Sequence, residues 1–296
     1  MMRWLKAVQS SLQRLRDLEA RSERIQIALG RIEARQTANA TSLADAEFGV
    51  FSQWGEDGIL QWLINRVPIE KRVFVEFGVQ DYMESNTRFL LVNNSWSGLV
   101  IDGDAGNVER IRRNDVYWRH NLNAVCAFVT RENINSLLAE SGLSGDIGLL
   151  SIDVDGNDYW IWEAINCISP RIVVVEYNAR FGSKRAVTVP YDPKFVRSAA
   201  HYSMIYYGAS LSALALLAEK TGYALVGCNS SGNNAFFVRK DVMPENLRAL
   251  SAAEAYHPAQ FRESRDARGN LQFLSHDKEG ELLAGLPVVD VTAPRK

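Results

Sequence analysis

Two kinds of hydrophobic pattern divide the chain. Between about residues 48 and 240, short apolar runs alternate with segments whose apolar residues recur every three to four positions. The apolar runs predict strands at residues 73–77, 97–101, 147–152, 171–177, 223–228 and 235–239. The periodic segments predict helices at residues 85–92, 108–113, 133–141, 159–166 and 210–221. Because near-continuous apolar strands alternating with helices are typical of a parallel sheet covered on both faces, we predict a doubly wound, Rossmann-like α/β domain.

The first 38 residues follow a heptad pattern. Six of eight alternating a and d positions are apolar, and Ser11 and Ser22 occupy the other two. The apolar positions are Val8, Leu15, Leu18, Ile25, Leu29 and Ile32. This narrow stripe predicts an amphipathic helix that makes the protein a homo-oligomer through a coiled coil. Two alternatives are a helix that lies on its own domain and a basic helix that contacts an anionic membrane surface, helped by Trp4.

Three further segments complete the predicted organisation. Residues 39–47 are small, polar and non-periodic, which indicates a linker. Residues 48–240 form the α/β domain, and residues 241–296 are a polar, irregular extension to which the pattern assigns no role.

Composition narrows the class of protein. The 296 residues are 47% hydrophobic and 23% charged, as in a globular protein, and the net charge is −2. Bulk charge therefore does not favour a nucleic-acid partner, although residues 1–38 carry eight basic and four acidic side chains. The three cysteines show no disulfide or metal-ligand spacing, and we see no apolar leader or membrane-length run. We therefore expect a cytoplasmic protein.

Polar residues stand at the carboxyl ends of the predicted strands, where doubly wound sheets bind ligands. The first strand ends in Glu76 and Gly78, and a glycine there allows a tight turn and close approach of a ligand. The loop lacks the G-x-G-x-x-G pattern and contains acids, which counts against NAD and favours a cationic ligand such as a sulfonium. Asp102 ends the second strand and suits ribose hydroxyls. Asp104 either joins that site or caps the next helix.

Oxygen ligands crowd the next two strand ends. Asp153, Asp155 and Asp158 lie within six residues, and like charges so close together require a cationic partner. Glu176 and Asn178 end the following strand. Oxygens of Asp153, Glu176 and Asn178 would suit Mg²⁺ or Mn²⁺, and the same groups could equally hold a substrate hydroxyl.

These motifs resemble the FkbM-like branch of the class I S-adenosylmethionine-dependent methyltransferases. In that family an acid followed by x-Gly ends the first strand, an acid ends the second, Asp-Val-acid-Gly ends the fourth, and a Glu ends the fifth. The matching residues here are 76–78, 102, 153–156 and 173–176. Three more segments resemble motifs of an FkbM-like subgroup, at residues 51–57, 208–211 and 222–237. The likeness departs at Tyr82, where a second glycine is common, and at Asp102-Gly103, where Glu-Pro is usual.

The resemblance implies a mostly parallel seven-stranded sheet with an antiparallel last strand, and S-adenosylmethionine as the cofactor. It further implies methyl transfer to oxygen, and we predict an O-methyltransferase acting on a hydroxyl of a sugar, a glycan or a related small molecule. The predicted cofactor residues are Glu76, Gly78, Ser85, Asn86, Asp102, Asp104 and Asp153. Because the hydroxyl must be aligned and deprotonated, we expect a general base among Asp155, Asp158 and His201.

The insert at residues 179–207 is rich in aromatic and basic side chains. We expect Arg180, Tyr191 and Tyr206 to contact the substrate from this insert. Three other functions are alternatives: a non-catalytic scaffold, which Tyr82 keeps open, a nicotinamide-dependent oxidoreductase and a nucleic-acid methyltransferase. The missing glycine pattern counts against the oxidoreductase, and the acidic strand ends count against nucleic acid.

Overall fold

The structure is a computed structural model that describes residues 2–293, without the side chains of residues 2–8 and 16. The expectations for Trp4 and Val8 fall on side chains outside the described part. Among residues 2–293, none of the helices combines the length and the apolar character that crossing a membrane requires.

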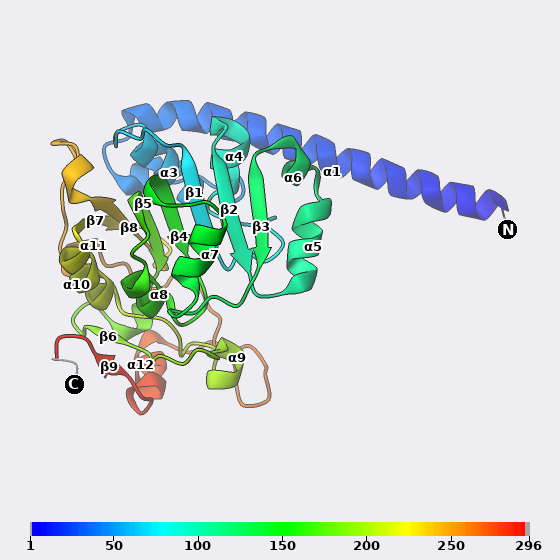
Figure 1. Ribbon diagram of the computed structural model, residues 1–296. Helices are drawn as coiled ribbons and strands as arrows, with labels where there is room; N and C mark the ends of the chain where they lie inside the picture. Colours follow the sequence, from blue (N-terminus) through cyan, green and yellow to red (C-terminus); the bar gives the residue numbers. More distant parts are fainter. Residues whose placement is uncertain (1, 294–296) are drawn as a thin grey trace.

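A seven-stranded sheet in the order β3-β2-β1-β4-β5-β8-β7 forms the centre of the molecule (Figure 1). Its strands are β1 (Val73–Phe77), β2 (Ser97–Asp102), β3 (Leu122–Cys126), β4 (Gly145–Ile152), β5 (Ile168–Glu176), β7 (Tyr223–Cys228) and β8 (Asn234–Arg239). Strand β8 runs antiparallel to both β5 and β7, and the other neighbours are parallel. The predicted mostly parallel, seven-stranded sheet with an antiparallel last strand is therefore confirmed.

Helices cover both faces of the sheet. One face packs against α7 (Ile134–Glu140), α8 (Asp158–Ala164) and α10 (Leu211–Thr221). The other packs against α3 (Glu56–Ile64), α4 (Arg88–Asn94), α5 (Ala105–Arg113) and α6 (Asp115–Arg119). Alternate side chains of each strand enter opposite layers: Val75 joins the first core and Phe74 the second. The strand order reverses between β1 and β4, so their carboxyl ends form the crevice in which such sheets bind ligands.

The first 46 residues contain more structure than the linker that we predicted. Helix α1 (Met2–Gln36) runs along one side of the domain and extends beyond α5 (Figure 1). It is followed by a 3₁₀ turn (Thr37–Asn39) and by α2 (Leu43–Ala46). Thr37, Leu43 and Ala46 are buried, because this segment covers part of the core around α3.

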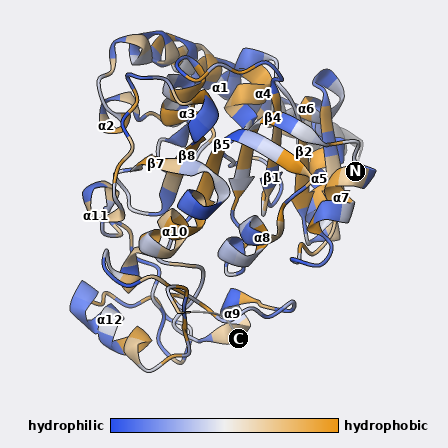
Figure 2. Cartoon of the chain, turned by 60° about the vertical axis from the view of Figure 1, so that its left-hand side comes forward, coloured by the Kyte–Doolittle hydropathy of each residue, from blue (hydrophilic) through white to orange (hydrophobic). Residues whose placement is uncertain are grey.

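The C-terminal extension folds onto the insert after β5. Strand β6 (Val187–Thr188) in the insert pairs antiparallel with β9 (Val289–Asp290) in the extension. Side chains of the insert and the extension form a small separate core. It includes Phe181 and Ile205 of the insert and Leu283 of α12 (His276–Ala284). Figure 2 shows α12 together with α9 (Arg197–Ala200) at one end of the molecule. The two segments therefore form a lobe beside the sheet.

Candidate functional site

Two cavities open at the carboxyl ends of the central strands. The larger has a volume of about 570 Å³ and the smaller about 160 Å³. Gly78, Gln80, Asp153 and Asp155 line both of them. The site therefore consists of two compartments that share a wall at the point where the strand order reverses.

Gly78 forms the centre of this shared wall. Its φ of +72° lies in the left-handed region, and a Cβ atom at this position would stand 1.6 Å from the carbonyl oxygen of Asp153. Glycine is therefore required both for the turn after β1 and for its contact with the loop after β4. The loop after β1 also holds Gln80 and Tyr82 at positive φ. Tyr82 thus keeps the left-handed backbone at the place where a glycine is common, and its buried side chain lines neither cavity.

Glu76 is buried at the end of β1 and lines the larger cavity. Its carboxylate accepts hydrogen bonds from the backbone N–H groups of Asn86 (2.8 Å) and Thr87 (3.1 Å) and from the Thr87 hydroxyl. Burial raises the pKa of Glu76 to about 7 despite these donors. Ser85 and Asn86 line the same cavity, so three predicted cofactor residues meet here.

Asp102 ends β2 and lines the smaller cavity. One carboxylate oxygen accepts from the N–H of Gln80 (2.8 Å), and the other accepts from the N–H of Asp104 (2.8 Å) and from the Asn107 side chain (3.0 Å). Asp104 caps α5 by accepting from the N–H of Asn107 at 2.8 Å. It lines neither cavity, so its predicted place among the cofactor residues is corrected to that of a helix cap.

The smaller cavity is largely apolar apart from its acids. Phe128 and Val129, which follow β3, form one side, and Ile101 of β2 lies beside them. The Phe128 side chain is 48% exposed. Asn133 holds the loop around it by donating to the Phe128 carbonyl and accepting from the N–H of Thr130. This compartment can therefore hold a flat apolar ring next to the carboxylate of Asp102.

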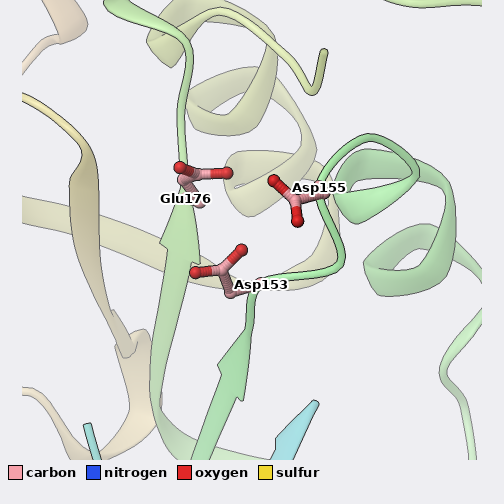
Figure 3. A group of neighbouring side chains, drawn as sticks. All are labelled: Asp153, Asp155 and Glu176. Carbon is pink, nitrogen blue, oxygen red and sulfur yellow. The ribbon is translucent and has the colours of Figure 1, made fainter. Parts of the chain in front are cut away.

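Three carboxylates lie close together at the carboxyl ends of β4 and β5, as Figure 3 shows. Ligand oxygens of Asp153, Asp155 and Glu176 all lie within 4.8 Å of one another. Glu176 is only 8% exposed, and its Oε2 atom has no hydrogen-bond partner. Burial, followed by the charges of neighbouring acids, raises the pKa values of Asp153 and Glu176 well above the usual range. This group can bind a cation or a proton.

Arg197 of α9 is the cation that borders the three carboxylates. Its guanidinium lies 2.9 Å from Asp155 and also pairs with Glu263. The group stacks over the Tyr207 ring at 3.8 Å. It therefore connects the insert, the extension and the loop after β4.

Two other predicted residues near the carboxylates shape loops. Asp158 is fully buried, and its carboxylate accepts from the N–H groups of Val154 (2.8 Å) and Gly156 (3.0 Å). Asn178 donates to the carbonyls of Ile205 (2.9 Å) and Tyr207 (3.0 Å), and its own oxygen caps the turn that follows. Because these polar atoms are already used, Asp158 is corrected from candidate base to loop cap, and Asn178 is replaced by Asp155 in the metal-ligand set.

The structure does not bring the predicted insert residues to the cavities. The Arg180 side chain is 2% exposed and pairs with Glu263 (2.8 Å) and Glu279 (3.2 Å). The other three also make contacts within the chain: Tyr206 donates to the Pro287 carbonyl, Tyr191 donates to Glu132, and His201 lies 2.6 Å from the Ser203 hydroxyl. Arg180, Tyr191, Tyr206 and His201 line neither cavity. Their predicted substrate and base roles are therefore corrected to structural ones.

An aromatic wall of the larger cavity was missed by the sequence analysis. Trp54 stacks on Phe261 of the extension with ring centres 5.3 Å apart and planes at 22°. The indole N–H of Trp54 has no hydrogen-bond partner. The signal for Trp54 lay in the segment 51–57, whose resemblance to an FkbM-like motif we noted. For Phe261 no comparable signal existed.

Acids of the same motif fix Trp54 in place. Asp57 accepts from three successive backbone N–H groups at 2.7–2.8 Å, and Glu56 accepts from the N–H of Trp54. Glu56 also binds the side-chain amides of Asn229 and Asn234 in the turn between β7 and β8. The segment before α3 and the last hairpin are thereby held against each other beside the cavity.

Neither a family model nor a curated protein matches the sequence. Among solved structures, the N-terminal domain of EvdMO1 with SAH bound aligns with 62% of this chain and 79% of its own, at 11% identity and a TM-score of 0.40. TrmK of M. capricolum in complex with S-adenosyl-homocysteine aligns with 61% of this chain and 67% of its own, at 10% identity and a TM-score of 0.35. An O-methyltransferase from Bacillus cereus in complex with SAH aligns over 56% and 72%, at 14% identity and a TM-score of 0.33. These values are too low to assign an activity to this chain.

Proposed function

We propose that this protein is an S-adenosylmethionine-dependent methyltransferase. The observation that carries the proposal is the pair of compartments around Gly78, each with a buried acid at a strand end: Glu76 in one and Asp102 in the other. Acids in the larger compartment would repel a pyrophosphate, whereas an ammonium and a sulfonium match them electrostatically. This supports S-adenosylmethionine over a nicotinamide dinucleotide.

Each part of the cofactor has a matching surface. The smaller cavity, with Phe128 and Val129, suits the adenine ring. A carboxylate offers about four acceptor positions, and Asp102 uses three, so one is left for a ribose hydroxyl. Glu76 lies in the larger cavity, where an ionised carboxylate can accept from the ammonium of the methionine part. Gly78 between them allows the chain of the cofactor to pass close to the backbone.

The proposed acceptor is a hydroxyl of a sugar, a glycan or a related metabolite. The stacked Trp54 and Phe261 rings give a flat apolar surface, on which the apolar face of a sugar ring can pack. Asn233 and Gln53 add amides to the same wall. A surface that combines a flat apolar area with several amides fits the mixed faces of a sugar ring.

Asp155 is the proposed general base, because it is the one predicted base that lines the cavities. It belongs to a group of three carboxylates whose oxygens lie within 4.8 Å of one another, and this group can accept the proton of the hydroxyl. The oxygens of Asp153, Asp155 and Glu176 would also fit Mg²⁺ or Mn²⁺, since the Oε2 atom of Glu176 lacks a partner. Such an ion would lower the pKa of a bound hydroxyl.

Calorimetric titration with S-adenosylhomocysteine and S-adenosylmethionine, with and without Mg²⁺ and with NAD as a control, tests the proposal. We expect micromolar binding of both sulfur compounds, roughly tenfold or greater loss in Glu76→Ala and Asp102→Ala, and no effect of Glu140→Ala, an exposed acid on α7. A folded protein that binds neither compound would contradict the proposal and leave the scaffold function. Tyr82, the residue that kept the scaffold alternative open, lies outside both cavities.

Methyl transfer is tested next with labelled S-adenosylmethionine and a panel of neutral sugars, phenols and amines. We expect label on sugar hydroxyls, and we expect Trp54→Ala to raise KM for the acceptor while the affinity for S-adenosylhomocysteine is kept. Trp118→Ala, at an exposed tryptophan, serves as the matched control. Label found only on amines or carbon acids would refute a hydroxyl acceptor, while the proposal of S-adenosylmethionine as the cofactor would stand.

A further inference from the structure

Helix α1 attaches to its own domain through one narrow face. The attached residues, spaced alternately four and three apart, are Glu23, Ile27, Gly30, Ala34 and, just after the helix, Thr37. A Cβ on Gly30 would lie 2.3 Å from Val50, and Ile27 and Ala34 pack on the small core around Phe89. In the heptad frame set by the apolar stripe these residues are at b and f, away from the a and d seam. Two further contacts come from Gln26 at e, which donates to the Val50 carbonyl, and from Arg31 at c, which donates to Asn93.

The apolar stripe of α1 lies on a different side of the helix and is uncovered. Its side chains are 52–62% exposed, including the part of the helix that is attached to the domain. They are Leu15, Leu18, Ile25, Leu29 and Ile32. The attachment of the helix to its own domain therefore leaves the a and d positions accessible to another helix.

We propose that this stripe binds the same stripe of a second copy of the chain, with the two α1 helices parallel. The g positions that flank the stripe carry Arg14, Arg21 and Arg35, and the e positions carry Glu19 and Glu33. In a parallel pair each g residue faces the e residue five positions later in the partner, which places Arg14 opposite Glu19 of the partner subunit. An antiparallel pair would bring g against g and e against e, so that like charges meet.

The surface of α1 already has the groove that a parallel partner requires. A shallow hollow is lined by Leu18, Arg21, Ser22 and Ile25, at positions d, g, a and d, and also by Arg24 at c and Ala28 at g. The first four positions form the hole that receives an a residue from a parallel partner. The small Ser22 leaves this layer underfilled, so it is the point at which the interface can be strengthened.

The charges also distinguish a second copy from a membrane. A helix that lies on an anionic bilayer carries basic residues on its polar face next to the apolar stripe. Here Glu19 and Glu33 border one side of the stripe along its length. Negative lipid headgroups would be repelled there, whereas Arg14 of the partner subunit would be attracted to Glu19.

Light scattering and sedimentation equilibrium of the full chain test the inference. We expect an oligomer for the unmodified protein and for Ala20→Asp, which places an acid on an exposed outer position of the same helix. Ile25→Asp should give a folded monomer, because Ile25 is exposed in the single chain. Ser22→Leu should lower the dissociation constant roughly tenfold or more, since it adds buried apolar surface.

The orientation is tested with two charge reversals. Arg14→Glu alone places Glu against Glu of the partner, and Glu19→Arg alone places Arg against Arg, so each variant should assemble less well. Mixed together, the two variants restore both opposite-charge pairs in a parallel pair and should assemble better than either alone. A monomeric full chain, a monomer that sediments with phosphatidylserine–phosphatidylcholine vesicles, or mixed variants that assemble no better than the separate ones would each overturn the inference. None of these outcomes depends on methyl transfer.

Discussion

At the scale of single residues, the close packing of the loops after β1 and β4 determines the form of the site. Gly78 has no room for a side chain, because the carbonyl of Asp153 occupies the space in which a Cβ would stand. The carboxylates of Asp153 and Asp155 are thereby fixed relative to Glu76 on the neighbouring strand. The wall between the compartments is therefore built by backbone as much as by side chains.

Gly78→Ala should unfold the turn and abolish cofactor binding. Alanine at φ +72° carries the cost of a left-handed backbone, about 1–2 kcal/mol, and here it also collides with Asp153. Gly142→Ala is the matched control, because Gly142 has φ +75° and open space around the added atom. Denaturant titration should show a clearly larger loss of stability for Gly78→Ala. Equal losses would mean that the loop after β4 moves aside readily.

Glu76 gives the site a pH dependence. Burial raises the pKa of its carboxyl from 4.5 to about 7, so the group is largely protonated below pH 7 and ionised above it. Since an ammonium requires the ionised form, affinity for S-adenosylhomocysteine should rise about tenfold per pH unit up to pH 7 and then level off. Calorimetry from pH 5.5 to 8.5 measures this, and Glu76→Gln should bind weakly with a flat profile. A flat profile in the unmodified protein would show that Glu76 does not contact the charge.

The predicted residues that the structure brings to the cavities are those whose position follows from the sheet alone. Glu76, Gly78, Asp102, Asp153 and Glu176 stand at or just after strand ends, and parallel strands bring such residues to one edge. The predictions for Asp158 and Asn178 failed for a local reason. Both side chains are consumed by N–H and C=O groups of nearby loops, and the sequence does not tell such a capping group from a ligand.

At the scale of elements, strand β3 and the structure of the C-terminal extension could not be predicted from the hydrophobic pattern. Strand β3 is at the edge of the sheet, so only Leu122 and Ala124 of its five residues are buried, and the continuous apolar run of the central strands is missing. The extension supplies Phe261 and Glu263 to the cavity. That contact joins residues far apart in the chain and depends on the ion pairs of the lobe, which no short motif encodes.

Helix α1 should detach from the domain when its narrow face is enlarged. Gly30→Leu would drive a side chain into Val50, because even a Cβ would lie 2.3 Å from it. Ala20→Leu adds a comparable group to an exposed position of the same helix. Hydrogen exchange of amides 23–36 should become faster in Gly30→Leu and stay unchanged in Ala20→Leu. Unchanged protection in both would show that Val50 and Phe89 repack around the larger residue.

At the scale of the whole molecule, the two segments of the lobe, the insert and the extension, are joined by a buried arginine. The guanidinium of Arg180, at the start of the insert, pairs with Glu263 and Glu279 of the extension. Breaking a buried pair is costly because it leaves charge without compensation. The same pairs keep Phe261 beside Trp54, so the acceptor wall depends on them.

Arg180→Met should therefore lower the free energy of unfolding by about 3–5 kcal/mol, as Glu279 is left buried without a cation. Affinity for an acceptor should fall, while affinity for S-adenosylhomocysteine should change little. Arg185→Met, at an exposed arginine of the same insert, is the control for both measurements. A stability change no larger than that of the control would mean that the lobe is held by its apolar core alone.

Arg88 joins the loop after β1 to helix α1. Its guanidinium donates to the Tyr82 carbonyl in the loop after β1 (2.9 Å) and to Glu23 of α1 (2.7 Å), and it stacks on Phe51 at 4.5 Å. A ligand that orders the loop and a partner that fixes α1 therefore act on the same side chain. Coupling free energies are reciprocal. If assembly raises the affinity for the ligand by some factor, binding of the ligand must raise the affinity of assembly by the same factor. The protein would then sense its own concentration, and Glu23 is the residue through which it would do so.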